Sequence, residues 1–202
     1  PPSGHLALCA TNLPEPTIGP NSATQADDHF NTVTFSGTGS SPLSVTGVGF
    51  QPDWLWLKRR DSATNGHNIH YDSTRGGTNA LRSSTSGAEA QFGDMVITFA
   101  SDGFSFTGTD GLNASSDYSN VAWNWKANGG TTSSNSDGTT TSTVQANTTA
   151  GFSIITYTGN ATAGATIGHG LGKAPKWIIT KARSGSYSWL VGHEGLASDP
   201  SV

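Results

Sequence analysis

The sequence has 202 residues, of which 33% are hydrophobic, and a formal net charge of −4 at pH 7. The lack of a basic cluster argues against nucleic-acid binding, and no apolar run has the length of a membrane span or the layout of a signal peptide. The single cysteine, Cys9, excludes an intrachain disulfide and is expected to be a small buried residue, so stability must come from packing, oligomerisation or both.

The elements expected along the chain are strands and turns. Residues 1–28 hold prolines at positions 14, 16 and 20 and predict an extended connector. Residues 29–127 hold strand-length apolar runs between Gly, Asn and Asp turns, which predicts about seven strands of an antiparallel β-sandwich module and no helix. Residues 128–150 are rich in Gly, Ser and Thr and predict a flexible linker. Residues 151–202 predict the start of a second, truncated module, cut from something longer.

A long repeat organises the chain. The stretch 30–60 reads FNTVTFSGTG, a variable turn, then GVGFQPDWLWLKRR, and it returns at 152–183 as FSIITYTGNA, a variable turn, then GLGKAPKWIITKAR. This separation is domain-sized and too long for a solenoid unit. Each Gly-x-Gly predicts a tight turn with positive φ, and each tryptophan is expected to be a buried core anchor on one shared backbone shape. The anchors of the repeat are Gly49, Pro52 and Trp54 in the first copy and Gly172, Pro175 and Trp177 in the second.

One group of residues has the chemistry of metal ligands. His70 and Asp72 share one face of a predicted strand, and His67 lies nearby on the other face. Imidazole and carboxylate are both ligands of metal ions, but this set is short of the number that zinc requires. A polar strand next to a turn is therefore the favoured interpretation, and no metal or cofactor is predicted.

Two further patterns resemble catalytic or phosphate sites only superficially. The run 168–173 (GHGLGK) lacks the glycine spacing of a phosphate loop, and Ala174 stands where Ser or Thr would bind magnesium. Asp102 and Asp110 could form a glycosidase pair, but Asp beside Gly is typical of turns. No catalytic motif with a nucleophile or a zinc-binding spacing occurs. The sequence therefore predicts a protein that is not an enzyme.

The six tryptophans allow two interpretations, core packing or carbohydrate contact. Core packing is the default for tryptophans within strands, and it is expected for Trp54, Trp123, Trp125 and Trp177. An exposed aromatic cluster would instead offer a platform for a sugar ring. Trp56, Trp189 and Tyr118 are the candidates for such carbohydrate contact.

Several segments together resemble a known group of proteins. They are LALCATNLPEPTI, TGVGFQPDWLWLKRR, HYDSTRG, FASDGFSFTG, VAWNWKANGG, TTAGFSIITYTGN and GHGLGKAPKWIITKAR. In this order they are similar to segments of large tandem-repeat virion proteins of marine tailed bacteriophages, and the resemblance covers nearly the whole chain. The second copy departs from the pattern because it carries Lys176 where the first has Asp53.

The resemblance implies a structural, tail-fibre-like role in the virion. Modules of this kind follow a lectin-like domain, so tandem β-sandwiches of jelly-roll or lectin-like type are expected. The resemblance brings no catalytic or ligand-binding residues with it. It implies a component of a fibre or appendage, assembled in the host cytoplasm and exposed on the particle, with other virion proteins as partners.

Two alternatives stay open, together with the identity of the partners. The protein could be a head-fibre or decoration protein of the capsid without a receptor role, or a polysaccharide-degrading tailspike. Exposed loops on a rigid scaffold could contact a host-surface glycan or protein. A homo-oligomer is expected, a trimer by analogy with phage fibres, with neither nucleic-acid binding nor membrane insertion.

Overall fold

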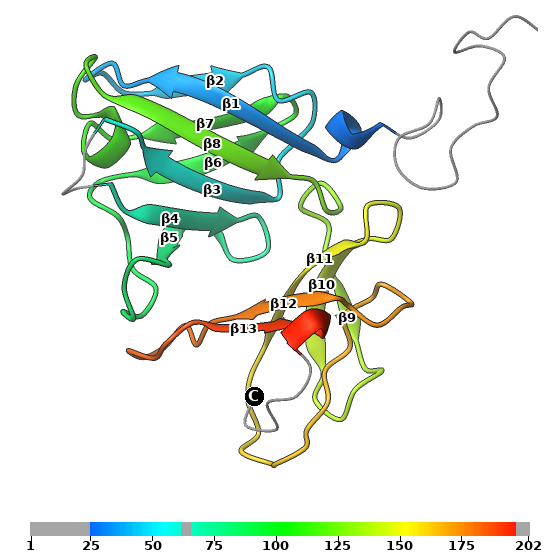
Figure 1. Cartoon of the computed structure of the whole chain (residues 1–202). Coiled ribbons are helices and arrows are strands. Elements are labelled where there is room, and N and C mark those ends of the chain that lie inside the picture. The colour runs from blue at the N-terminus through cyan, green and yellow to red at the C-terminus, as the bar shows by residue number, and fades with distance from the viewer. Residues whose placement is uncertain (1–24, 62–65, 197–202) are drawn as a thin grey trace, which may run out of the picture.

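The computed structural model describes residues 25–61 and 66–196. Within these ranges the chain consists of antiparallel β-sheets, and it contains no α-helix (Figure 1). This confirms the predicted all-β class. The connector at 1–28 lies outside the described residues except for its last four, and Cys9 lies outside them as well. The short 3-10 segments are η2 (Ala26–Asp28), η3 (Gly111–Asn113) and η4 (Glu194–Leu196).

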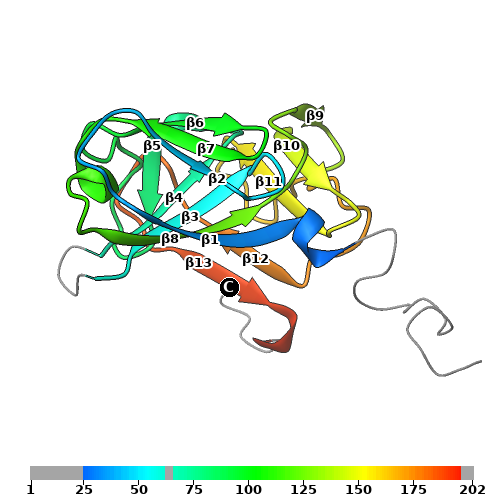
Figure 2. The same cartoon turned by 90° about the horizontal axis from the view of Figure 1, so that it is seen from above.

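The first unit is a sandwich of two sheets. A five-stranded sheet has the order β1-β8-β3-β4-β5, and a three-stranded sheet of order β2-β7-β6 packs on it (Figures 1 and 2). Eight strands thus replace the seven expected, because β2 falls in the stretch read as a variable turn. The bounds are β1 (Phe30–Ser36), β2 (Leu43–Thr46), β3 (Trp54–Arg59), β4 (Asn68–Asp72), β5 (Gly76–Arg82), β6 (Val96–Ala100), β7 (Gly103–Thr107) and β8 (Ser119–Trp125).

The side chains of β8 face the opposite way from that expected. Leu55 and Leu57 of β3 point into the core and are completely buried. Since Asn124 lies opposite Leu55 in the sheet, β8 turns its asparagines inward and its tryptophans outward. The amide of Asn124 is satisfied on the donor side, because its Nδ2 donates to the carbonyl oxygens of Asn31 (3.0 Å) and Ala122 (3.1 Å).

The remaining strands form two smaller sheets. One is three-stranded with the order β11-β10-β9, and the other pairs β12 with β13. The predicted flexible linker at 128–150 is therefore wrong, because β9 and β10 lie within it and Val144 and Gln145 are buried. Its β-branched Thr and Val residues pair with β11 in a hairpin. The bounds are β9 (Ser133–Asn135), β10 (Ser142–Asn147), β11 (Phe152–Tyr157), β12 (Trp177–Thr180) and β13 (Leu190–His193).

The two copies of the repeat form corresponding elements. β1 and β3 in the first copy correspond to β11 and β12 in the second, and the hairpin β3–β4 corresponds to β12–β13. Gly47 and Gly49 have φ of 84° and 87°, and their counterparts Gly170 and Gly172 have φ of 72° and 68°. Both Gly-x-Gly turns thus use the left-handed region that glycine enters at no steric cost.

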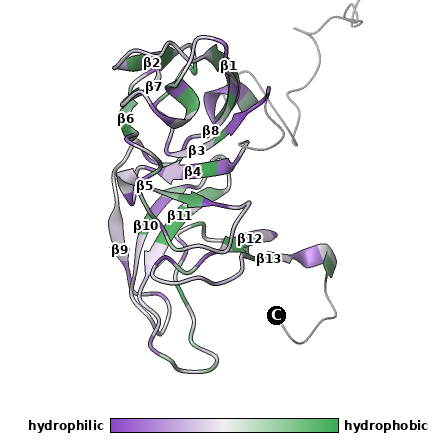
Figure 3. Cartoon of the chain, turned by 90° about the vertical axis from the view of Figure 1, so that its left-hand side faces the viewer, coloured by the Kyte–Doolittle hydropathy of each residue, from purple (hydrophilic) through white to green (hydrophobic). Residues whose placement is uncertain are grey.

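Hydrophobic residues lie along the strands of both units (Figure 3). In the described ranges, no helix has the length and apolar character needed to cross a membrane.

Candidate functional site: an aromatic junction between the two copies

The outer face of the five-stranded sheet is aromatic. Trp54 lies opposite Trp125 and Trp56 lies opposite Trp123, so all four rings point away from the core. The ring centroids of the first pair are 4.3 Å apart and those of the second are 5.3 Å apart. All four side chains are half-buried. A surface of this kind is large and apolar enough to bind a second element.

Two side chains of the second copy cover part of this face. The ring of Phe152 lies 6.0 Å from Trp54 and stacks nearly parallel to it. The ring of Trp189 lies 5.3 Å from His70, and its Nε1–H donates to the carbonyl oxygen of Arg82 at 3.0 Å. The aromatic face is therefore a junction between the two copies, which we call the aromatic junction.

The structure corrects the expected roles of two repeat anchors. Trp54 is not a core anchor, because it belongs to the outer face, and Trp177 is 57% exposed. The reason is that the run of alternating Trp and Leu is apolar on both faces, so its pattern does not decide which face is the core. Gly49, Pro52, Gly172 and Pro175 remain in the turns that lead into β3 and β12.

The carbohydrate candidates fall into two places. Trp56 and Trp189 lie together, since both rings contact His70, at 5.1 Å and 5.3 Å. Tyr118 belongs to a different contact, in which the guanidinium carbon of Arg59 lies 3.2 Å from the centre of its ring. The three therefore do not form one platform.

Ion pairs extend the junction beyond the rings. Glu89 accepts hydrogen bonds from Arg183 of the second copy and from Arg75 of the first. Burial raises the pKa of Glu89, but the hydrogen bonds from the two guanidinium groups outweigh it and leave the pKa lowered. A main-chain hydrogen bond stabilises the same contact, because the Glu89 N–H donates to the Arg183 carbonyl oxygen at 2.9 Å.

A buried amide ties the linker region to the first unit. Gln145 of β10 is completely buried. Its Nε2 donates to the hydroxyls of Ser73 and Thr74, both at 2.9 Å. Its Oε1 accepts from the N–H groups of Asn128 at 3.1 Å and Gly130 at 2.9 Å. Every hydrogen-bonding group of this side chain is thus used to hold turns together.

Asp53 is the main polar anchor of the same region. Its buried carboxylate accepts hydrogen bonds from the Ser73 hydroxyl and from the N–H groups of Ala127, Gly129 and Gly130, at 2.7 to 2.9 Å. The counterpart Lys176 instead forms an exposed ion pair with Glu194. The Asp53 carboxylate therefore fixes residues 127–130, the segment that follows β8. The described part of the second copy contains no equivalent of this segment.

The metal-ligand candidates do not converge. His67 Nδ1 lies 2.9 Å from the Ser84 hydroxyl, and Asp72 is paired with Arg75. No group of three or more His, Cys, Asp or Glu side chains placed to hold a metal occurs within residues 25–61 and 66–196. Burial, with a contribution from the charge of Arg75, lowers the pKa of His70 to about 4. His70 is thus a neutral residue at pH 7, packed beneath tryptophans.

The two aspartates of the glycosidase hypothesis are turn residues. Asp102 accepts from the N–H groups of Gly47 (3.1 Å) and Gly49 (2.7 Å), and these bonds lower its pKa. The N–H of Asp110 donates to a carboxylate oxygen of Asp94 at 2.8 Å. Both contacts hold loops at the ends of β2 and β7, so they have a structural role.

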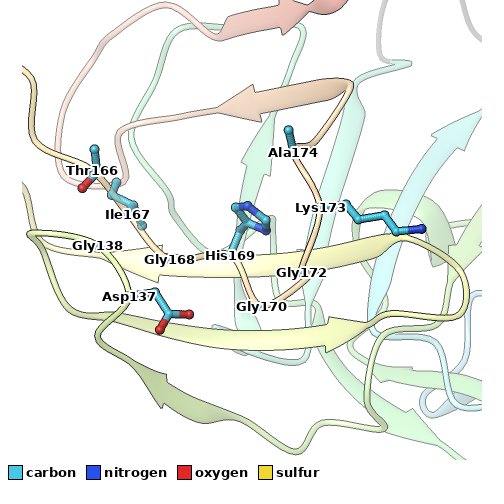
Figure 4. A pocket seen from close by; sticks show the side chains of 10 residues that line it. All are labelled: Asp137, Gly138, Thr166, Ile167, Gly168, His169, Gly170, Gly172, Lys173 and Ala174. Carbon is cyan, nitrogen blue, oxygen red and sulfur yellow. The ribbon is translucent and has the colours of Figure 1, made fainter.

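All residues of the run 168–173 except Leu171 line a surface pocket of ≈ 590 Å³ (Figure 4). His169 and Lys173 extend in different directions, and Asp137 lies on the opposite wall. The Nδ1 of His169 accepts from the N–H of Leu171 at 3.2 Å. The pocket therefore lacks a set of converging groups that could hold a phosphate or carry out catalysis.

Comparison with known proteins gives one match. A family model described as a domain of unknown function (DUF7483) matches residues 25–202. The chain belongs to this family. No curated protein and no solved structure matches it.

Sequence reasoning missed the residues that hold this DUF7483 domain together. Asp53 and Gln145 are single polar residues within apolar or low-complexity stretches, and their partners are distant in sequence. The departure of Lys176 from Asp53 in the repeat was the one available signal that residue 53 has a partner absent from the second copy. Phe152 is a repeat residue, but its docking on Trp54 follows only from the three-dimensional arrangement.

Proposed function

We propose that the chain is a non-catalytic structural module of a bacteriophage virion fibre or appendage, built from repeated β units that dock through aromatic faces. The observation that carries the proposal is the aromatic junction. Phe152 and Trp189 of the second copy pack on the tryptophans and His70 of the first. Such a contact between repeats lets a chain grow by adding units, as an extended appendage requires.

The ionisable groups support a structural role. The shifted carboxylates Asp61, Asp94 and Asp102 are each hydrogen-bonded within turns or to a neighbouring arginine. The buried His70 is lined by aromatic rings and a serine hydroxyl. A catalytic group needs a reacting atom within reach, and the carboxylates are occupied by contacts that hold the fold, while the Nδ1 atom of His70 is buried without a hydrogen-bond partner among the described residues.

The place in the virion rests on the resemblance to tandem-repeat phage proteins. Antibodies raised against the purified chain, used for immunogold microscopy of the phage that encodes it, test this. Label along fibres supports the proposal, and label over the capsid supports a decoration protein instead. Unlabelled particles that lack the protein by mass spectrometry overturn the virion assignment. Incubation with host capsule polysaccharide tests the tailspike alternative, which predicts new reducing ends.

Contact with a host glycan is a second candidate, favoured by the pairing of Trp56 with Trp123. These half-buried rings lie beside each other on the outer face. An aromatic pair of this kind can stack on the apolar face of a sugar ring. Glycan-array binding that is lost in Trp56→Ala and kept in Tyr118→Ala would support this role, and an array without signal would remove it.

A further inference from the structure

Among the described residues the second unit has no counterpart of β8. In the first unit β8 lies between β1 and β3 and is antiparallel to both. The counterparts in the second unit are β11 and β12. Among the described residues β11 pairs only with β10 and β12 only with β13, and no strand lies between them. Each of these two strands therefore has an edge without a partner.

The hydrogen-bond pattern shows which groups of β12 face the open edge. In the first unit the Ser73 N–H donates to the Asp53 carbonyl oxygen at 2.8 Å, so this carbonyl and the main-chain groups of residues 55 and 57 face β4, whereas the Asp53 N–H donates to the Trp125 carbonyl oxygen of β8 at 2.8 Å. The matching bond in the second unit runs from the Glu194 N–H to the Lys176 carbonyl oxygen at 3.0 Å. Because successive residues alternate, the N–H and C=O groups of Trp177 and Ile179 point to the open edge.

The side chains of β12 lack the cover that β3 receives. Leu55 is completely buried, whereas its counterpart Ile178 is 50% exposed. Trp54 packs on Trp125 of β8 at 4.3 Å, whereas its counterpart Trp177 is 57% exposed. An apolar strand with an open edge and exposed aromatic and aliphatic side chains is a site for adding a strand.

The turn before β12 also lacks a contact that its counterpart before β3 makes. In the first unit the Gly47–Gly49 turn holds the carboxylate of Asp102, from the turn between β6 and β7. The corresponding turn at Gly170 and Gly172 has the same left-handed backbone, and Lys173 follows it. Within the described residues these two glycine N–H groups hold no carboxylate. Because Asp102 belongs to the β6–β7 turn and not to β8, this difference shows that the second unit lacks more than one neighbour of the first.

We propose that the gap between β11 and β12 is a docking site for one antiparallel polypeptide strand with the chemistry of β8. The strand carries bulky aromatic residues at two alternate positions, in register with Trp177 and Ile179, as Trp125 and Trp123 are with Trp54 and Trp56. This inference concerns how a unit is completed and goes beyond the proposed location in a virion.

The geometry favours such a strand over a second copy of the chain. The β8 strand of a second copy is already paired on both sides, by its own β1 and β3. Edge pairing between two β12 strands would cover β12 and leave β11 open. Because β11 and β12 correspond to β1 and β3, one inserted strand would satisfy both edges at once, as β8 does in the first unit.

The test joins the sequence of residues 119–126 (SNVAWNWK) to the C-terminus of the whole chain through a flexible Gly/Ser linker of about 20 residues. Such a tether gives an effective concentration on the order of millimolar, so even a weak strand addition is populated. The control tether replaces both tryptophans by serine. Amide hydrogen exchange, read residue by residue, is compared between the two fusions.

We expect the amides of Trp177 and Ile179 to exchange at least ~10-fold more slowly with the tryptophan tether than with the serine tether. Trp177→Ser should abolish most of this protection. Leu190→Ser, which removes an equally exposed apolar side chain from the strand away from the gap, should leave it within about two-fold. Ile179→Pro provides a second test, because it removes an edge N–H.

Equal exchange in the two fusions would overturn the proposal. So would protection that survives both Trp177→Ser and Ile179→Pro. Protection of β12 in the untethered chain that rises with protein concentration, together with a dimer in sedimentation, would assign the gap to a second copy and refute the occupant proposed.

Discussion

The two copies of the repeat show that local sequence determines which residues form a strand, whereas the neighbouring strands determine how deeply that strand is buried. In both copies the strand that carries the repeat tryptophan, β3 or β12, has an antiparallel hairpin partner and is preceded by a left-handed Gly-x-Gly turn, whereas β2 has no counterpart strand in the described part of the second copy. Yet Leu55 is completely buried and Ile178 is 50% exposed. The difference lies in the neighbours: β3 has β8 beside it and a second sheet over it, whereas within residues 25–61 and 66–196 β12 pairs with β13 alone. The same strand is thus a core element in one place and an open edge in the other.

The largest contrast is expected at the residue where the copies differ in charge. Asp53→Asn keeps the shape but places an amide donor against main-chain N–H groups, so we expect a loss of about 3–5 kcal/mol in the free energy of unfolding. Lys176→Ala should cost less than about 0.5 kcal/mol, because its ion pair is exposed. Urea denaturation of both variants measures this. Similar costs at the two positions would show that the carboxylate does not anchor the first unit.

The next contrast compares equivalent apolar positions. Leu55→Ala creates a cavity in the sandwich and should cost about 2–4 kcal/mol, whereas Ile178→Ala should cost less than about 1 kcal/mol. Thermal or urea unfolding of the two variants measures these two losses in the free energy of unfolding. A large loss in Ile178→Ala would mean that β12 is covered in solution and that the difference between the copies is smaller than described.

A smaller effect is expected from the buried histidine at the junction. His70 has a pKa of about 4 in the folded protein, below its ordinary 6.5, so the unfolded chain binds the extra proton first as pH falls. Stability should therefore decrease by about 2–3 kcal/mol between pH 6.5 and pH 4 and then level off for this group.

The pH series needs two variants. His70→Gln should remove the decrease above pH 4.5, and His193→Gln, at an exposed histidine, should keep it. Loss of stability at lower pH belongs to the carboxylates with lowered pKa, such as Asp94 and Asp102. An unchanged slope in His70→Gln would show that His70 is not buried at the junction.

The smallest effect concerns a hydroxyl in the core of the first unit. The side chain of Tyr71 is fully buried, and its hydroxyl has no hydrogen-bond partner among the described residues. Burial raises its pKa to about 12. Tyr71→Phe should therefore be neutral or stabilise by up to about 1 kcal/mol, and Tyr157→Phe, at an exposed tyrosine, should have no effect. Destabilisation by Tyr71→Phe beyond about 1 kcal/mol would reveal a partner for the hydroxyl.

The sequence predicted the elements better than their faces. FNTVTF and VAWNWK form β1 and β8 as expected, because short runs of β-branched and aromatic residues carry the local signal for strands. β8 alternates as predicted, but a period-2 rule would put its tryptophans inside, and the asparagines lie there instead. Asn120 and Asn124 are accepted in the core because backbone carbonyls satisfy their donors, which is a non-local condition.

The linker and the junction could not be predicted for related reasons. β10 is polar in composition and becomes a strand because β11 pairs with it and because Gln145 finds partners from the first unit. The sequence predicts Trp56 and Trp189 as exposed rings, yet each is half-covered by groups distant in sequence. Such contacts leave no periodic trace in the sequence.

The most direct test of the comparison between copies is amide hydrogen exchange of the unmodified chain at equivalent residues. We expect the amides of Trp54 and Trp56, bonded to β8, to exchange at least about 100-fold more slowly than those of Trp177 and Ile179 at the open edge of β12. Equal protection at both pairs, independent of protein concentration, would contradict the claim that β12 is an uncovered copy of β3.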